Sequence, residues 1–302
     1  MISIVVYTRN EEANIRACLA TVQWSDDIHV VDSHSEDDTA VIAKAAGARV
    51  VSRSYTDESE HKNWTMQNLP FKHHWVFQID ADERCTKELA GEMLSAARNP
   101  GPCVAFRFPR RDFLLGRWIR HVQLQRHSLR LMRPDAVRYE RRVHPVCHVG
   151  GPVGQLNAYL DHFPFNRGMS HWIERHNRYS SLEAEEVLSS VKTRMGADLY
   201  KSFTERDCHA RRYYQKRVFY RLPLRSLLKF AFLYIVRAGF LDGKAGLHYA
   251  LLQSWYEYMI ALKTTELRDR LGNRRSEEPA AGDRAECVPL HADEIGYRDL
   301  TL

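Results

Sequence analysis

Two aspartates follow a short apolar run in the first third of the chain. The run from Trp75 to Ile79 is mostly apolar on both faces, which is typical of a covered strand, and Asp80 and Asp82 come directly after it. If the extended geometry continues, both carboxylates point the same way and can meet one cation. Carboxylate oxygens suit Mg²⁺ or Mn²⁺, and Mg²⁺ commonly uses one or two carboxylates together with substrate phosphates. The alternative is that Asp80 caps a following helix whose first turn holds Asp82 and Glu83.

The residues up to Asp80 predict a parallel α/β sheet. Strands and helices are expected to alternate, with strands at 2–7, 28–31, 48–52 and 74–80 and helices at 10–23, 41–46 and 59–68. This alternation is typical of parallel strands joined by crossover helices. Asp32 follows the second strand as Asp80 follows the fourth, so both carboxylates are expected at one edge of the sheet. Asn10 is expected to cap the first helix.

The composition leaves several partners open. The chain has 302 residues and 44% apolar content, which allows one large domain or two smaller ones with a sizeable core. Its 44 basic and 38 acidic residues give a net charge of +6, a modest excess that suits anionic substrates, a membrane surface or nucleic acid. We expect no secretory signal at the N-terminus and no membrane span, because no stretch reaches the ~20 apolar residues required.

Several motifs, taken in order, resemble those of one enzyme family. Residues 4–12, 30–39 and 80–82 are similar in order and spacing to family-two glycosyltransferases with the GT-A fold. Further motifs resemble the branch of glucosyltransferases that builds the bacterial lipopolysaccharide core, and these lie at 62–64, 75–83, 116–121, 130–133 and 239–243. The resemblance extends over about residues 1–263. Each motif alone is loose, but their joint order is specific.

The resemblance implies a fold and an activity. The fold would be α/β of the GT-A type, with a mostly parallel central sheet flanked by helices and a C-terminal helical extension. The activity would be a metal-dependent, inverting transfer of a hexose from a nucleotide sugar, expected to be UDP-linked, to a lipopolysaccharide-core, exopolysaccharide or lipid-linked acceptor. The expected parts are a nucleotide-sugar half at 1–108, an acceptor half at 109–210, a helical membrane-associating extension at 211–265 and a polar tail at 266–302.

The resemblance also implies which residues hold the donor. Tyr7 and Asp32 would line the base pocket, with Asp32 accepting a hydrogen bond from a uracil imide N–H. Lys62 would approach the base or the diphosphate. Asp82 would bind Mg²⁺ or Mn²⁺, and Asp80 would touch the ribose or the metal. The cation would neutralise the departing nucleoside diphosphate.

Four more residues fall in or near the matching motifs. Asn10, Glu11 and Arg130 are assigned with their motifs to the nucleotide-sugar site. His162 matches a histidine of the family that would reach the diphosphate or the metal. The alternative for His162 is a buried structural histidine.

An inverting transferase needs a group, usually a carboxylate, to take the acceptor's proton. The matching motifs leave this catalytic base open. The related branch often has Val-His-Glu where this chain has Val-His144-Pro. Glu140 is the nearest carboxylate, and Asp112 is expected in the preceding acceptor loop, part of the arginine-rich and aromatic segment 109–127. His144 is the third candidate. For Glu140 the alternative is an ion pair with a neighbouring arginine.

The last third of the chain predicts contact with a membrane. Residues 211–229 are strongly basic and aromatic, and 227–241 are mainly apolar but too short to span a bilayer. This pattern favours an interfacial helix on an anionic leaflet, at the cytoplasmic face of the inner membrane. The alternative is a helical hairpin that caps the catalytic domain.

Two other functions remain as alternatives. A sugar-phosphate nucleotidyltransferase also uses an α/β sheet and acidic metal ligands, but it would show a Gly- and Arg-rich loop after the first strand, which residues 7–11 lack. A basic-aromatic nucleic-acid binder would leave Asp32 and Asp80 unexplained. We therefore expect a nucleotide-sugar donor and a glycan or lipid-linked acceptor as partners, and no nucleic acid.

Overall fold

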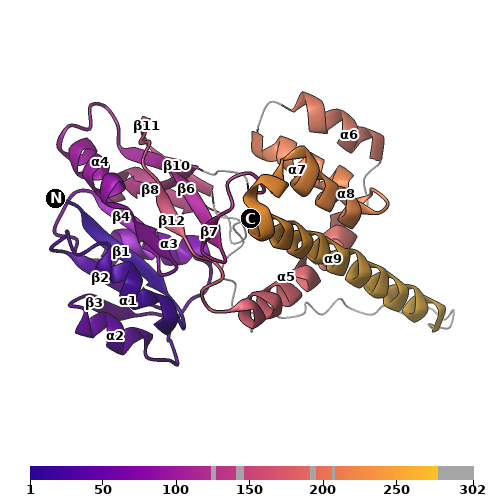
Figure 1. Cartoon of the computed structure of the whole chain (residues 1–302), viewed down its shortest axis with the longest axis horizontal. Coiled ribbons are helices and arrows are strands. Elements are labelled where there is room, and N and C mark those ends of the chain that lie inside the picture. Colours follow the sequence, from indigo (N-terminus) through magenta and orange to yellow (C-terminus); the bar gives the residue numbers. More distant parts are fainter. Residues whose placement is uncertain (124–126, 141–145, 191–194, 206–207, 278–302) are drawn as a thin grey trace, which may run out of the picture. The chain divides into compact units, whose positions relative to one another are not determined.

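The chain divides into two compact units (Figure 1). The computed structural model describes residues 1–123, 127–140, 146–190, 195–205 and 208–277. The described part of unit 1 comprises 1–118, 127–140 and 146–167, and that of unit 2 comprises 119–123, 168–190, 195–205 and 208–277. Unit 1 contains the sheet, and unit 2 is helical.

Unit 1 is built on a sheet of ten strands within its described residues. They are β1 (Ser3–Thr8), β2 (Ile28–Asp32), β3 (Arg49–Ser52), β4 (Val76–Asp80), β5 (Glu83–Cys85), β6 (Ala105–Leu114), β7 (Arg117–Trp118), β8 (His127–Met132), β11 (Val153–Gln155) and β12 (Leu160–His162). Their order is β3-β2-β1-β4-β8-β6-β12-β5, with β7 and β11 also paired to β6. The first four are mutually parallel, and β8 runs antiparallel to β4 and β6.

Helices cover both faces of this sheet. They are α1 (Glu12–Ala20), α2 (Thr39–Ala45), α3 (Glu58–Asn68) and α4 (Lys87–Arg98). Side chains alternate across a strand, so Ile4 packs in one core with Ile15 of α1 and Leu89 of α4. Val5 packs in a second core with Met66 of α3. The predicted α/β architecture with a mostly parallel sheet is confirmed.

A short turn and a hairpin follow β8. The turn η1 (Pro134–Ala136) leads into β9 (Val137–Glu140), which pairs with β10 (Val146–Val149) in a separate two-stranded sheet. Asn63 of α3 joins this hairpin to the main layer, because its Nδ2 donates to the Tyr139 carbonyl at 2.7 Å.

Unit 2 consists of helices in its described residues. They are α5 (Met169–Ser190), α6 (Met195–Thr204), α7 (Cys208–Tyr220), α8 (Arg225–Ala231), a π-helical turn η2 (Phe232–Val236), a 3₁₀ turn η3 (Gly239–Asp242) and α9 (Gly243–Glu277). α9 packs on α5 and α8, and α6 packs on α7. Leu224 and Ala238, at the two ends of α8 and η2, have left-handed backbones with φ of 51° and 54°. Within the described helices, none is long and apolar enough to cross a bilayer.

Three local expectations are wrong. Asn10 does not cap α1, which begins at Glu12; its φ is 54°, because its backbone N–H donates to Ser35 Oγ at 2.8 Å in the loop after β2. Residues 109–114, expected to begin a loop, extend β6 because β8 and β12 pair with it on both sides. Residues 266–277, expected in a tail, continue α9. The expected boundaries at 108 and 210 fall inside β6 and α7.

Candidate functional site

Asp32 and Asp80 lie at the same edge of the sheet, as predicted. β2 and β4 flank β1, and the three strands are parallel. Thr8 of β1 stands opposite Asp32, and Tyr7 stands opposite Asp80. The carboxyl ends of parallel strands are where open α/β sheets bind ligands, so this edge is the candidate site.

Asp80 is held by an arginine of the neighbouring strand. Arg130 of β8 donates from Nη2 to Asp80 Oδ2 at 2.6 Å, and the Asp80 side chain keeps 32% of its surface exposed. Burial would raise the pKa of Asp80, but the charges of Arg130 and Lys62 outweigh it, so this pKa lies below its ordinary value. Asp80 is therefore ionised at neutral pH and can accept a cation or a hydroxyl.

Two buried residues that sequence reasoning missed complete this frame. Glu83 is fully buried; its Oε2 accepts the Asp80 backbone N–H at 2.9 Å, and its Oε1 lies 3.3 Å from Arg130 Nη2. Burial raises the pKa of Glu83 to about 7. Arg110 of β6 lies 3.9 Å from Glu83 Oε1 and 3.2 Å from Asp112 Oδ1. Arg110 and Asp112 are two residues apart on one strand, so their side chains lie on the same face, and this spacing could have predicted the contact between them.

His162 connects Asp82 to Asp112. β12 pairs with β6 so that His162 stands opposite Asp112, and its Nδ1 makes a short hydrogen bond to Asp112 Oδ1. The other ring nitrogen, Nε2, lies 3.3 Å from Asp82 Oδ2. Burial and Arg110 lower the pKa of His162, but the two carboxylates outweigh them and raise it to about 9. The structure thus brings His162 beside Asp82 and fixes its ring through Asp112.

The donor atoms at this edge fit a divalent cation that is completed by a substrate. In the part of the chain that the structure describes, no group of three or more His, Cys, Asp or Glu side chains could hold a metal ion by itself. However, Mg²⁺ needs only one or two carboxylates when phosphate oxygens fill its other positions, and Asp80 and Asp82 would be these carboxylates. A metal-bound histidine also characteristically donates its other ring N–H to a carboxylate, and His162 would do so toward Asp112 once a cation displaced the proton that its raised pKa keeps on Nε2.

The residues predicted for the base pocket are partly engaged in local contacts. Asp32 is 2% exposed; its Oδ1 accepts the Thr8 hydroxyl at 3.0 Å and its Oδ2 accepts the Ser35 backbone N–H at 2.9 Å. A carboxylate has about four lone-pair positions, so a further donor can still be accepted. Tyr7 is half-buried beside His61, with ring centroids 5.5 Å apart, and burial raises its pKa.

The other predicted donor residues lie on the loop and helix next to this edge. Asn10 Oδ1 accepts the Glu36 backbone N–H at 2.8 Å, which joins the loops after β1 and β2. The Glu11 side chain is 18% exposed in the same loop. Lys62 of α3 lies over the ring of Tyr139, with Nζ 5.3 Å from the centroid. These residues surround the strand ends, although no hydrogen bond between them and the strand-end aspartates is described.

Glu140, the first candidate base, is accessible at the end of β9. Its side chain is 54% exposed, and its Oε2 lies 3.2 Å from His148 Nε2 in the hairpin. The preceding Tyr139 is anchored to the sheet, because its hydroxyl donates to Gln78 Oε1 at 3.0 Å on β4, two residues before Asp80. This hydrogen bond fixes β9 against the sheet at the residue before Glu140.

The other two candidate bases differ from Glu140. Asp112 is 5% exposed and is already paired with Arg110 and His162, so it is suited to holding groups in place. His144 lies outside the residues that the structure describes.

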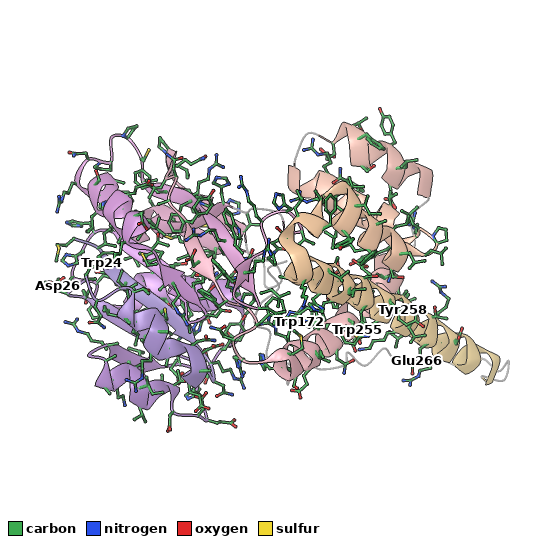
Figure 2. The ribbon with its side chains drawn as sticks, viewed as in Figure 1. Trp24, Asp26, Trp172, Trp255, Tyr258 and Glu266 are labelled. Atoms are coloured by element: carbon green, nitrogen blue, oxygen red, sulfur yellow. The ribbon has the colours of Figure 1, made fainter. Side chains whose placement is uncertain are left out.

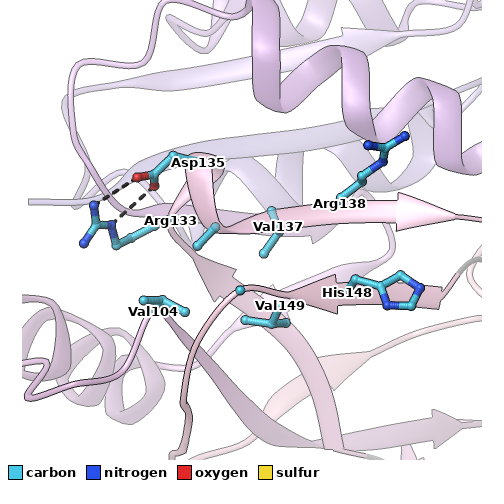
Figure 3. Close-up of a pocket in the computed structure, with 9 residues that line it drawn as sticks. Val104, Arg133, Asp135, Val137, Arg138, His148 and Val149 are labelled. Carbon is cyan, nitrogen blue, oxygen red and sulfur yellow. Dashed lines mark hydrogen bonds and ion pairs between the residues drawn. The ribbon is translucent and has the colours of Figure 1, made fainter.

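Two pockets lie beside the β9–β10 hairpin. One, of about 500 Å³, is lined by Arg133, Asp135 and His148 among others, with Arg133 Nη2 3.0 Å from Asp135 Oδ2 (Figure 3). The other, of about 550 Å³, is lined by residues of α3 and β9 that include Asn63 and Glu140. Neither is lined by the strand-end aspartates, but the second places Glu140 in a concave surface that an acceptor could enter.

Comparison with known sequences gives a family match and several relatives. The family model for glycosyl transferase family 2 matches residues 3–160. A lipopolysaccharide core biosynthesis glycosyltransferase, LpsC of Rhizobium meliloti, is 31% identical over 204 residues, which cover 63% of this chain and 73% of that protein. An uncharacterized glycosyltransferase of Rickettsia bellii is 34% identical over 108 residues, which cover 35% of this chain and 36% of that protein.

Solved structures give only partial matches. Glucosyl-3-phosphoglycerate synthase from Mycobacterium tuberculosis, in complex with Mn²⁺, UDP and glucosyl-3-phosphoglycerate, is 24% identical with a TM-score of 0.33. The match covers 37% of this chain and 44% of that one. Mannosyl-3-phosphoglycerate synthase from Rubrobacter xylanophilus is 23% identical with a TM-score of 0.33, covering 37% and 40% of the two chains. Both matches cover less than half of either chain.

Proposed function

Because this chain belongs to glycosyl transferase family 2, we propose that it transfers a hexose from a UDP-sugar to an acceptor hydroxyl, with inversion and with Mg²⁺ or Mn²⁺. The observation that carries the proposal is the position of Asp80 at the sheet edge that Asp32 also borders, with Asp82 in the turn that follows, 3.3 Å from His162. A divalent cation bound there would neutralise the charge that develops on the leaving nucleoside diphosphate. The family match favours glycosyl transfer over nucleotidyl transfer, and the absence of a nucleic-acid partner stays a prediction.

The residues at this edge have distinct roles in the proposal. Asp80 and Asp82 supply the carboxylate ligands, with His162 beside them. Asp112 orients the imidazole of His162 through its Nδ1. Arg130 keeps Asp80 ionised and in place at a separation of 2.6 Å. Because these contacts exist before the donor binds, the site needs little rearrangement when the charge on the leaving group builds up.

We assign the removal of the acceptor's proton to Glu140. Its support is its exposure and its place in the pocket of about 550 Å³ next to α3. An exposed carboxylate is accessible to a hydroxyl, whereas Asp112 is buried and committed to His162 and Arg110. In this scheme Glu140 accepts the proton as the acceptor oxygen bonds to the anomeric carbon and the diphosphate leaves.

The acceptor is proposed from the relatives. LpsC of Rhizobium meliloti is named for lipopolysaccharide core biosynthesis. We therefore infer that this chain acts on a cell-envelope glycan: a lipopolysaccharide core, an exopolysaccharide or another lipid-linked acceptor. Such acceptors lie at a membrane, so the chain would work at the cytoplasmic face of the inner membrane.

Calorimetric titration of UDP with and without MnCl₂ tests the cation site. We expect UDP binding that depends on Mn²⁺ and that falls at least tenfold in Asp82→Asn. Asp135→Asn is the matched control, because Asp135 is a 68% exposed aspartate away from the strand ends. UDP binding that is equal in Asp82→Asn and wild type would refute the site. A hydrolysis panel of UDP-, GDP- and dTDP-sugars then identifies the donor.

A further inference from the structure

The exposed side chains between residues 222 and 241 are all apolar. They belong to the end of the turn after α7, to α8, to η2 and to η3, and they are Leu222, Pro223, Leu224, Leu227, Leu228, Phe232, Ile235, Val236, Phe240 and Leu241. We call these ten residues the apolar outer face. From 224 to 236 they recur every three or four residues, so they follow one side of the helix. Val236 is 73% exposed and Ile235 is 64% exposed, which is unusual for a contiguous set.

The charged side chains of the same segment make contacts within unit 2, and Arg225 is buried. Arg225 Nε and Lys229 Nζ each lie 3.8 Å from the Glu257 carboxylate of α9. Arg237 Nε donates to the His121 carbonyl at 3.1 Å. This is the reverse of a normal surface helix, which buries its apolar side and exposes its charges.

Exposed apolar side chains are stabilised when they contact apolar material outside the protein. Large contiguous apolar patches on a soluble protein mark sites of contact with protein or membrane. A protein–protein interface normally contains about one hydrogen bond per 100–200 Å² of buried area. The apolar outer face offers no side-chain hydrogen-bonding group among its ten residues, which favours the interior of a lipid layer.

The charge around this face selects the kind of lipid. Between residues 208 and 263, ten Lys and Arg stand against two Asp and Glu, a formal net charge of +8. Arg217 and Arg221 pair with Asp198, and Arg225 and Lys229 pair with Glu257, so the positive charge that faces solvent is smaller than this count. A second copy would be repelled by this charge, whereas an anionic leaflet attracts it by about 1 kcal/mol per basic residue near the surface. α9 also exposes Trp255 and Tyr258 (Figure 2), residue types enriched where lipid meets water.

We propose that the apolar outer face inserts into the interfacial layer of a bilayer that contains anionic phospholipid. The segment lies in the plane of the surface, because no described helix can span it. The biological role of this membrane binding rests on the proposed function, because a lipid-linked acceptor would lie in the same layer. The binding itself needs no catalysis and is measured separately.

Flotation of the full chain with vesicles tests the proposal. The probes are phosphatidylcholine vesicles with and without about 30 mol% phosphatidylglycerol, an anionic lipid. We expect flotation with the anionic vesicles and at least tenfold less with the neutral ones. The double variant Leu227→Gln/Ile235→Gln is expected to lose at least tenfold in partitioning to anionic vesicles. Val41→Gln/Val153→Gln is the matched control, because both valines are exposed (65% and 42%) in unit 1.

Three results would overturn the proposal. They are flotation of the Leu227→Gln/Ile235→Gln variant at the wild-type level, equal flotation with neutral and anionic vesicles, and a wild-type dimer in light scattering that this variant dissociates. UDP binding with Mn²⁺ is measured on every variant. If Leu227→Gln/Ile235→Gln binds UDP but does not float, the proposal is supported. If wild type floats but does not bind UDP, only the proposed function is refuted.

Discussion

Arg130 Nη2 lies 2.6 Å from Asp80 Oδ2, and the two residues come from adjacent antiparallel strands. The same nitrogen lies 3.3 Å from the fully buried Glu83. Removing the guanidinium would leave these carboxylates facing each other, with Arg110, 3.9 Å from Glu83, and Lys62 as weaker counter-charges. We expect Arg130→Met to reduce the free energy of unfolding by about 3 kcal/mol in urea titrations. Arg133→Met, on a 46% exposed arginine, should change it by less than about 0.5 kcal/mol, and similar losses in both variants would contradict this account.

Asp112 should act on the cation through His162. Its carboxylate bonds to His162 Nδ1, while Nε2 faces Asp82 at 3.3 Å. Losing a carboxylate that orients a metal-binding histidine typically weakens metal affinity by about 10- to 100-fold. We expect Asp112→Asn to raise the Mn²⁺ concentration needed for half-maximal activity in that range, with kcat at saturating Mn²⁺ reduced less. An unchanged Mn²⁺ dependence would remove Asp112 from this role.

Glu140→Gln should give the opposite pattern. Because Glu140 is assigned to the acceptor's proton and not to the donor, its loss should lower kcat by about 10²- to 10⁴-fold. The affinity for UDP with Mn²⁺ should stay within about twofold of wild type, since a rate effect of this kind does not require a binding effect. Turnover and calorimetry on the same preparation measure both quantities. Wild-type turnover would return the base to His144 or Asp112.

His176 should make unit 2 less stable in mild acid. It is 4% exposed, its ring stacks on Trp172 with centroids 3.5 Å apart, and its Nδ1 donates to the Trp172 carbonyl at 2.8 Å. Burial lowers its pKa to about 4, with the Arg175 charge acting in the same direction. As pH falls below about 6.5 the unfolded chain takes up a proton that the folded chain excludes, so stability is lost from there down to about pH 4.

The effect of His176 is measured as a difference from a phenylalanine variant. Between pH 7.5 and pH 5, wild type should lose about 2 kcal/mol more free energy of unfolding than His176→Phe, because about 1.5 pH units of that interval lie below the ordinary pKa. Urea titrations at the two pH values give both numbers. Equal losses would show that the imidazole takes up its proton without disturbing the fold.

The first half of the sheet could be predicted because its signals are local. The four parallel strands are short apolar runs, and right-handed crossover helices place their carboxyl ends at one edge, so Asp32 and Asp80 were correctly expected together. The helix expected at 59–68 is α3, Glu58–Asn68, capped by Asp57. In each case a single window of sequence contains the whole pattern.

The rest of the site depends on contacts between distant segments. Glu83 and Arg110 come together because β8 pairs with both β4 and β6. The hydrophobic periodicity of the separate segments does not predict this pairing. The same pairing turned an expected arginine-rich loop into strand. Asn10 has the side chain of a good helix cap, but bonds to the next loop drew its backbone into a left-handed conformation. Tertiary hydrogen bonds therefore decided what local propensity left open.

The helix that carries the apolar outer face begins and ends at strained joints. Leu224 and Ala238 hold φ values of 51° and 54°, a region that residues with a Cβ adopt at a cost of about 1 kcal/mol or more. Glycine would take the same angles freely and would loosen both corners. Leucine and alanine can adopt fewer backbone conformations than glycine at these two positions. We therefore expect the orientation of α8 and η2 within unit 2 to be fixed before the apolar outer face contacts any surface.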